Sequence, residues 1–278
     1  LKRSELNGII ELPSGFGEVK GEGRDARPTG TINVLYAKGS EQTGSALTAV
    51  MNQIANKINM HMGQPEAPLK AAGKAVGDEQ LKEFDYTFTG LLGFSLMSMG
   101  IFGLANQMPA EKQRGSYRRL RAAPFTSGQL IISMAIHYTI ISLLSLTMMI
   151  VVGMLLFHFN MRGDWLLFSL MSVISAMMMV GLGLLIGGWA KNENQSAPLS
   201  NLISFPMMFL SGAFFPAFLF PEWLRGVTQF IPMTPVVDGF RLIMTEQASL
   251  IEVLPQIGAV AAWVVVIYVV AIKLFRWE

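Results

Sequence analysis

Long uncharged apolar stretches dominate the chain after residue 85, and they restrict it to folds that a lipid bilayer can hold. A helix needs about 20 mostly apolar residues to cross the hydrocarbon core of a membrane. Five stretches reach this length. The sequence therefore predicts an α-helical integral membrane protein with five transmembrane helices, and Pro206 predicts a kink or break in the fourth. The five stretches are Tyr86–Leu104, Leu130–Phe157, Trp165–Ala190, Leu199–Phe220 and Leu254–Phe275.

The first third of the chain has the composition of a soluble domain. Residues 1–85 hold ten of the 21 basic and 11 of the 19 acidic residues. Short β-branched runs at 6–12 and 31–37 predict strands, and apolar side chains at helical spacing further along predict a helix with one apolar face. The chain therefore divides into a small mixed α/β domain, residues 1–85, and a transmembrane domain, residues 86–278. The apolar residues of that helix are Leu47, Val50, Met51, Ile54 and Ile58.

Basic residues in short connections indicate how the helices are oriented, because such connections stay in the cytoplasm. The connection at 105–129 carries five basic residues, whereas acidic residues outnumber basic ones at 221–253. We therefore expect 105–129 and the C-terminus in the cytoplasm, and 221–253 and residues 1–85 outside. A soluble domain before the first span needs a helix to bring it across, so we expect a sixth transmembrane helix before Leu1. The five basic residues are Lys112, Arg114, Arg118, Arg119 and Arg121.

Motifs for catalysis and for metal or nucleotide binding are absent from the sequence. There is no cysteine, and His61 has no second histidine or carboxylate at ligand spacing. There is no glycine-rich phosphate loop, and the basic residues lie at the edges of apolar runs, so we expect no nucleic-acid partner. The middles of the spans carry no Asp or Glu, which disfavours a proton- or sodium-coupled carrier. We therefore expect no enzyme activity, metal or cofactor in this chain.

Two features inside the spans leave alternatives open. The glycine-rich stretch Gly181–Gly188 lies in an apolar helix, so we interpret its small residues as allowing close helix packing rather than as a binding loop. His137 is the ionisable residue deep in the span that starts at Leu130. It is either a neutral histidine bonded to a neighbouring helix, or a contact on a substrate or proton path.

Four stretches, taken in their order and spacing, resemble the permease subunits of type-2 ABC exporters, a group that includes bacterial drug, antibiotic and peptide efflux permeases. In that group the second helix often has Pro-Gly at its entry, where this chain has Thr89-Gly90. The stretches are ELNGIIELPSGF at 5–16, FDYTFTGLLGFSLM at 84–97, EKQRGSYRRLRAAPFTSGQLIISM at 111–134, and FLSGAFFP at 209–216 followed by PEWLRGVTQFIPMTPVVDGFR at 221–241.

The resemblance implies a partner for the basic connection. It implies that Glu111–Arg121 is a coupling helix that docks on a cytoplasmic ATPase subunit, with Glu111 near its start and the arginines near its end, where they complement the helix dipole. The alternative is a charge cluster that only sets topology. The residues implied in coupling are Glu111, Arg114, Tyr117, Arg118, Arg119, Leu120 and Arg121.

The outer end of the fourth predicted span is a candidate gate. Phe214, Phe215 and Pro216 follow Gly212 and Ala213, whose small side chains would let another helix approach. In a dimer these residues would meet as an apolar plug that excludes water. The resemblance further implies that 221–253 is an outer re-entrant segment. The alternative is that these rings face lipid as part of an aromatic belt.

The resemblance implies the membrane subunit of an ATP-driven exporter in the cell (plasma or inner) membrane. Its partners would be a second permease copy or a paralogue, and two ATPase subunits that bind ATP and Mg. The apolar spans, rich in Met and Phe, favour an amphipathic or lipophilic cargo, such as a drug, antibiotic or peptide. The alternatives are a non-transporting surface protein whose outer domain binds a partner, in the manner of a phage receptor, and, less favoured, a secondary carrier.

Overall fold

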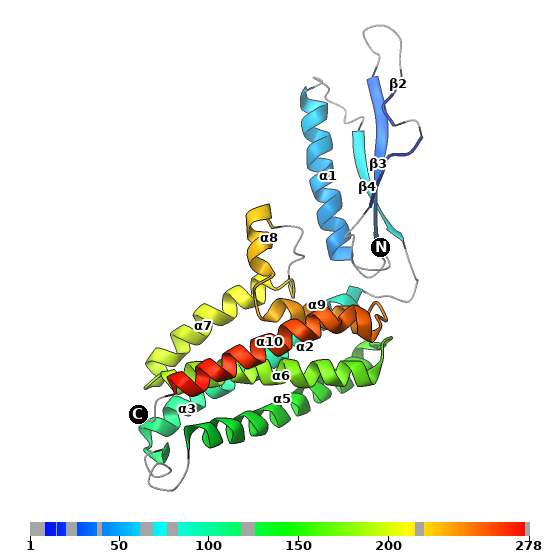
Figure 1. The fold of residues 1–278 in the computed structure, drawn as a ribbon. Helices are drawn as coiled ribbons and strands as arrows, with labels where there is room; N and C mark the ends of the chain where they lie inside the picture. Colours follow the sequence, from blue (N-terminus) through cyan, green and yellow to red (C-terminus); the bar gives the residue numbers. More distant parts are fainter. Residues whose placement is uncertain are drawn as a thin grey trace. The chain divides into compact units, whose positions relative to one another are not determined.

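The computed structural model describes residues 9–14, 16–20, 27–37, 41–61, 69–76, 83–117, 126–214 and 220–275. The chain forms two compact units, Leu1–Tyr86 and Thr87–Glu278. Figure 1 shows an α/β arrangement in the first unit and a group of helices in the second.

A small sheet with one helix packed on it forms the first unit. The long strand β3 pairs antiparallel with β1 and β2 and parallel with β4, and α1 connects β3 to β4 and packs on both. The runs expected to be strands lie in β1 and β3. The bounds are β1 Ile9–Glu11, β2 Glu18–Lys20, β3 Arg27–Ala37, α1 Glu41–His61 and β4 Leu69–Val76.

The face of α1 that packs on the sheet is not its most apolar face. Asn59 donates to the carbonyl oxygen of Leu69 at 3.0 Å, and Asn52 accepts from the backbone N–H of Ala71 at 2.8 Å. By contrast, Val50, Ile54 and Ile58 are 43%, 43% and 44% exposed. Small residues in β4 bring its backbone close to α1, so amide side chains pair with that backbone. Val50, Ile54 and Ile58 of the expected apolar face are therefore turned away from the sheet, whereas Leu47 and Met51 are half-buried.

The second unit consists of helices, several of which start at a polar cap. Thr126 and Gln129 form a reciprocal capping box at the start of α5, and Asp164 caps α6. Such caps bind the backbone N–H groups that have no partner inside the helix. The helices are α2 Glu83–Met97, the π-helix η2 Ser98–Gly103, α3 Leu104–Gln113, α5 Ser127–Phe157, α6 Trp165–Trp189, α7 Glu193–Leu210, α8 Glu222–Thr228, α9 Met233–Met244 and α10 Leu250–Leu274.

Among the described residues, four helices are long and apolar enough to cross a membrane. The stretch expected at Leu199–Phe220 corresponds to α7, which contains Pro198 and Pro206 and ends at Leu210. Within the described residues α7 is not one of the four, so a fifth span stays a prediction. The four are Thr87–Gln113, Ser127–Phe157, Trp165–Trp189 and Leu250–Leu274.

The helix α6 lies at the centre of this unit, between α5 and α10 in Figure 1, and also contacts η2, α3 and α9. Its glycines permit that position. A Cβ atom added at Gly183 would overlap the carbonyl oxygen of Gly100, and one at Gly187 would lie 2.8 Å from the carbonyl oxygen of Leu104. The packing role expected for Gly181–Gly188 is therefore confirmed.

The outer surfaces of α5 and α10 are apolar, as expected for helices that face lipid. Exposed side chains recur every fourth residue along α5, and each is more than half exposed. Only 22% of the most apolar window of α5 and 17% of that of α10 are buried, against 72% for α6. The recurring residues of α5 are Ile132, Ile136, Ile140, Leu144 and Met148.

Candidate functional site

The end of α3 places a lysine inside the helical unit. Lys112 is only 7% exposed. Its ammonium group donates to the carbonyl oxygens of Gly188 at 2.6 Å and Ala190 at 2.8 Å. These carbonyls lie where α6 ends, so they have no partner within the helix and carry the negative end of its dipole. The end of α6 therefore stabilises a buried positive charge on α3.

A third segment meets the same lysine. The ammonium nitrogen lies 5.6 Å from the centre of the Phe275 ring, which follows the end of α10. A Cβ atom added at Gly188 would lie 3.2 Å from that ring, so the glycine leaves room for it. A cation over an aromatic face is attracted by the ring. We call Lys112, Gly188, Ala190 and Phe275 the Lys112 junction, because it joins the ends of α3, α6 and α10.

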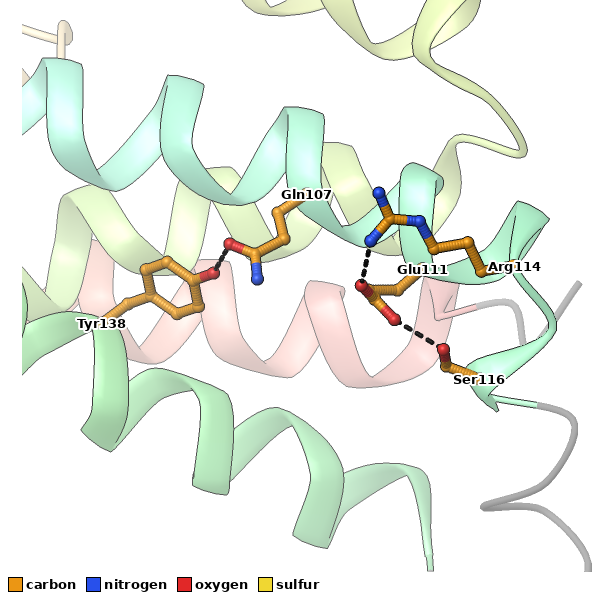
Figure 2. A network of polar contacts seen from close by, with 5 residues as sticks. All are labelled: Gln107, Glu111, Arg114, Ser116 and Tyr138. Carbon is orange, nitrogen blue, oxygen red and sulfur yellow. Dashed lines mark hydrogen bonds and ion pairs between the residues drawn. The ribbon is translucent and has the colours of Figure 1, made fainter.

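Glu111 closes the turn that follows α3 (Figure 2). Its carboxylate accepts from Arg114 at 3.1 Å and from the hydroxyl of Ser116 at 2.5 Å. The expectation that Glu111 lies near the start of a coupling helix is wrong, because it lies in the last turns of α3. The first candidate membrane-spanning helix, Thr87–Gln113, includes α3 and continues to Gln113. The chain then turns at Gly115, whose φ is +72°. Arg114 and Ser116, not a helix N-terminus, stabilise the Glu111 carboxylate.

Tyr117 anchors the next residues against α5. It is 3% exposed, and its hydroxyl lies 3.8 Å from the sulfur of Met134. Burial raises the pKa of Tyr117 well above its usual range, so the phenol stays neutral. Three residues of the predicted coupling set, Glu111, Arg114 and Tyr117, thus lie at the joined ends of α3 and α5. The other four, Arg118, Arg119, Leu120 and Arg121, lie outside the described residues.

A polar contact links α3 and α5 further along the same span. The hydroxyl of Tyr138 donates to the side-chain oxygen of Gln107 (Figure 2). The ring of His137 meets that of Tyr138 edge-on, with centroids 5.3 Å apart. His137 lies on the exposed face of α5, and among the described residues it has no hydrogen bond to a neighbouring helix. This arrangement does not match the interpretation of His137 as bonded to a neighbouring helix.

Phe214, at the candidate outer gate, packs within its own chain. Its ring contacts Phe94 of α2 edge-on, with centroids 5.8 Å apart. The chain leaves α7 through Gly212, whose φ is +82° and whose carbonyl oxygen accepts from Arg241 of α9. A Cβ atom added at Gly90 would overlap the backbone of Ala213, so α2 is the helix that approaches closely. Phe215 and Pro216 lie outside the described residues.

The expected re-entrant segment at 221–253 contains α8 and α9, and α9 is deeply packed. Val236 and Phe240 are fully buried, and Phe240 contacts Phe168 of α6 with ring centroids 5.3 Å apart. Burial raises the pKa of Asp238, against the opposing effect of Arg241.

Sequence reasoning counted Lys112 as a topological charge and did not single out Gln107 or Tyr138. For Lys112 the sequence offers no signal, because its partners are backbone carbonyls that any residue supplies. For Gln107 a signal existed: it forms, with Asn106, a pair of amide side chains after a long apolar stretch.

Comparison with known proteins gives one family over almost the whole chain: ABC-2 family transporter protein matches residues 1–273. ABC transporter G family member 20 of Dictyostelium discoideum is 24% identical over 208 residues, 74% of this chain and 28% of that protein. Linearmycin resistance permease protein LnrN of Bacillus subtilis is 20% identical over 186 residues, 66% of this chain and 48% of that protein.

A third relative is the probable multidrug ABC transporter permease YbhS of Escherichia coli. It is 27% identical over 123 residues, 44% of this chain and 33% of that protein. The chain spans less than half the length of each of these three relatives.

Proposed function

This chain belongs to the ABC-2 family of transporter proteins, and from that premise we propose that it is the membrane-spanning permease subunit of an ATP-driven exporter. The observation that carries the proposal is the family match over residues 1–273, which includes both the helices and the unit that precedes them. ATP and Mg would bind to a separate ATPase subunit. A second permease, identical or paralogous, would complete the transport path.

The names of two relatives support efflux as the direction. One is named a linearmycin resistance permease and another a probable multidrug permease. The broad apolar surface of the helical unit suits a cargo that partitions into the membrane. In the proposed orientation, residues 1–85 lie outside the cell and the basic connection and C-terminus lie in the cytoplasm.

The Lys112 junction supports a mechanism for coupling. The residues after Gly115 would dock on the ATPase, and closure of the ATPase subunits would displace them. Because Lys112 is bonded to the end of α6 and contacts Phe275, a displacement of α3 carries these two ends with it. The central helix α6 also contacts η2, α5 and α9, so the movement would spread through the unit.

At the other end of the unit, we propose that Phe214, Phe215 and Pro216 form the outer gate with their counterparts in the second permease. The left-handed backbone at Gly212 supports a turning point there, and Arg241 fixes its carbonyl. The gate would open by movement around the turn at Gly212. The hydrogen bond from Arg241 connects this turn to α9.

Isolation of the chain with an ATPase tests the partner proposal. We expect the full-length chain, purified from its native host in mild detergent, to retain an ABC ATPase subunit. Recovery without any ATPase, together with specific binding of another protein to residues 1–85, would favour the non-transporting surface protein instead.

A further inference from the structure

Exposed polar side chains of α3 and α5 lie beside a largely apolar surface of α5. Gln107 of α3 and His137 of α5 lie on the exposed surface, and Tyr138 between them is partly buried. Along the exposed face of α5, His137 is followed by Ile140 and Leu144, which are 61% and 64% exposed. The surface therefore combines a small polar group with a long apolar track.

The depth of this polar group makes its exposure significant. Leu130 begins the apolar part of α5, and Tyr138 lies eight residues further, about 12 Å along the helix at 1.5 Å per residue. On the inner side, within two turns of Tyr138 toward the start of α5, Met108 packs with Ile131 and Ala135 in a hydrophobic cluster. The polar group therefore lies within the apolar part of a candidate span, and uncovered polar side chains are costly in hydrocarbon.

The hydrogen bonds already present determine what this surface offers. Tyr138 donates to the side-chain oxygen of Gln107, which leaves the two N–H groups of that amide as donors. Among the described residues, neither these N–H groups nor the ring nitrogens of His137 have a hydrogen-bond partner. Glu111 lies one turn beyond Gln107, and Arg114 and Ser116 already occupy its carboxylate. These groups can therefore bind a partner that supplies hydrogen-bond acceptors.

We propose that Gln107, His137 and Tyr138 form a seat for the polar head of an amphipathic molecule that enters from the surrounding lipid leaflet. The head supplies acceptors to Gln107 and His137, and the apolar chain lies along Ile140 and Leu144. As a statement about cargo this rests on the proposed function, but binding at the seat requires neither ATP nor transport.

A photolabelling experiment on the full chain in lipid nanodiscs tests the seat without nucleotide. The probe is hexadecylphosphocholine with a diazirine in its chain, and the comparison probe is hexadecane with the same diazirine and no head. We expect the headed probe to label 104–113 and 130–148 more strongly than the exposed surface of α10, and excess unlabelled hexadecylphosphocholine to compete. The headless probe should label both surfaces alike.

Substitutions identify the residues. Gln107→Leu combined with His137→Leu should reduce labelling by the headed probe about tenfold, because the hydrogen bonds to the head are lost. Tyr138→Phe should give a smaller reduction. It removes the hydrogen bond that holds the Gln107 amide in place but keeps the N–H groups of that amide. Gln113→Leu removes another exposed amide of α3 and serves as the matched control, with labelling unchanged.

Three results would overturn the seat. The first is equal labelling of the two surfaces by the headed probe, and the second is unchanged labelling in the double variant. The third is that neither probe labels this surface and a cysteine introduced at Ser133 crosslinks to another membrane helix. Failure of ATP-driven export with normal labelling would count against the proposed function alone. Normal export with none of the expected labelling would count against the seat alone.

Discussion

The ammonium nitrogen of Lys112 lies 2.6 Å from the carbonyl oxygen of Gly188 and joins the end of α3 to the end of α6 across 76 positions of sequence. This bond places a buried charge directly before the connection that carries the remaining basic residues. It connects the ends of two candidate spans, as the proposed coupling mechanism requires.

Replacing Lys112 with methionine should destabilise the protein and weaken coupling. The substitution keeps much of the side-chain volume but leaves the carbonyls of Gly188 and Ala190 without a donor. Hydrogen bonds to charged groups contribute about 1.5–3 kcal/mol each, so we expect a clearly lower midpoint of thermal unfolding in detergent. Lys191→Met is the matched control, because Lys191 lies beside the junction but is exposed. Equal midpoints for the two variants would contradict a stabilising role for the junction.

Gly183→Ala should disturb the contact between α6 and η2. The added methyl group would overlap the carbonyl oxygen of Gly100, and overpacking of this kind costs about 1–3 kcal/mol. Gly258→Ala in α10 meets no atom within 4 Å, and alanine is the better helix former by about 1 kcal/mol. Thermal unfolding should therefore show a lower midpoint for the first variant and an equal or higher one for the second. The reverse order would contradict the close approach of these helices.

Stability should depend on pH through Glu246. Burial raises the pKa of Glu246 from its ordinary 4.5 to about 7, and Arg241 opposes the rise. Between these values the folded protein retains a proton that the unfolded chain releases, so the contribution of this group to stability is lost as the pH rises. Glu246→Gln should raise the unfolding midpoint more at pH 8 than at pH 5. Parallel midpoint curves for parent and variant between these pH values would show that Glu246 does not titrate in this way.

The spans could be predicted from sequence because length and apolar composition alone define a helix that crosses a membrane. The sequence could not show that α6 is central and α5 peripheral. In a bilayer both the protein interior and the lipid are apolar, so the sequence does not distinguish Leu144 of α5, which is 64% exposed, from Leu184 of α6, which is 1% exposed. The glycines were the informative residues, since Gly183 and Gly187 mark the side on which α3 and η2 approach.

The details of the candidate site depended on where the first candidate membrane-spanning helix, Thr87–Gln113, ends. The resemblance to type-2 ABC exporter permeases implied a separate coupling helix from Glu111 to Arg121, which placed Glu111 at a helix start. The helix instead continues from the membrane span until Gly115 allows the left-handed turn. The face of α1 that packs on the sheet could not be predicted from the sequence either. Asn52 and Asn59 pair with the backbone of β4, and backbone partners give no signal in the side-chain pattern.

Reversing two charges of the basic connection should separate its roles. Arg118→Glu with Arg119→Glu leaves Arg114 and Arg121 to hold the loop in the cytoplasm, so we expect normal insertion into the membrane. Recovery of the ATPase with the chain should fall about tenfold, equivalent to about 1.4 kcal/mol of binding free energy. Quantitative immunoblotting measures insertion as the amount of the chain in isolated membranes, and ATPase recovery as the amount of ATPase in the purified complexes. A normal complex in the double variant would leave the charge cluster with a topological role only.

ATP hydrolysis by the assembled complex, measured in nanodiscs with and without amphipathic compounds, tests most directly whether this chain is the membrane subunit of an ATP-driven exporter. We predict that such a compound stimulates hydrolysis by the parent complex, and that the Lys112→Met complex retains basal hydrolysis but loses the stimulation. Hydrolysis that is identical for the ATPase alone and for the ATPase with this chain, with every compound tested, would contradict the proposal.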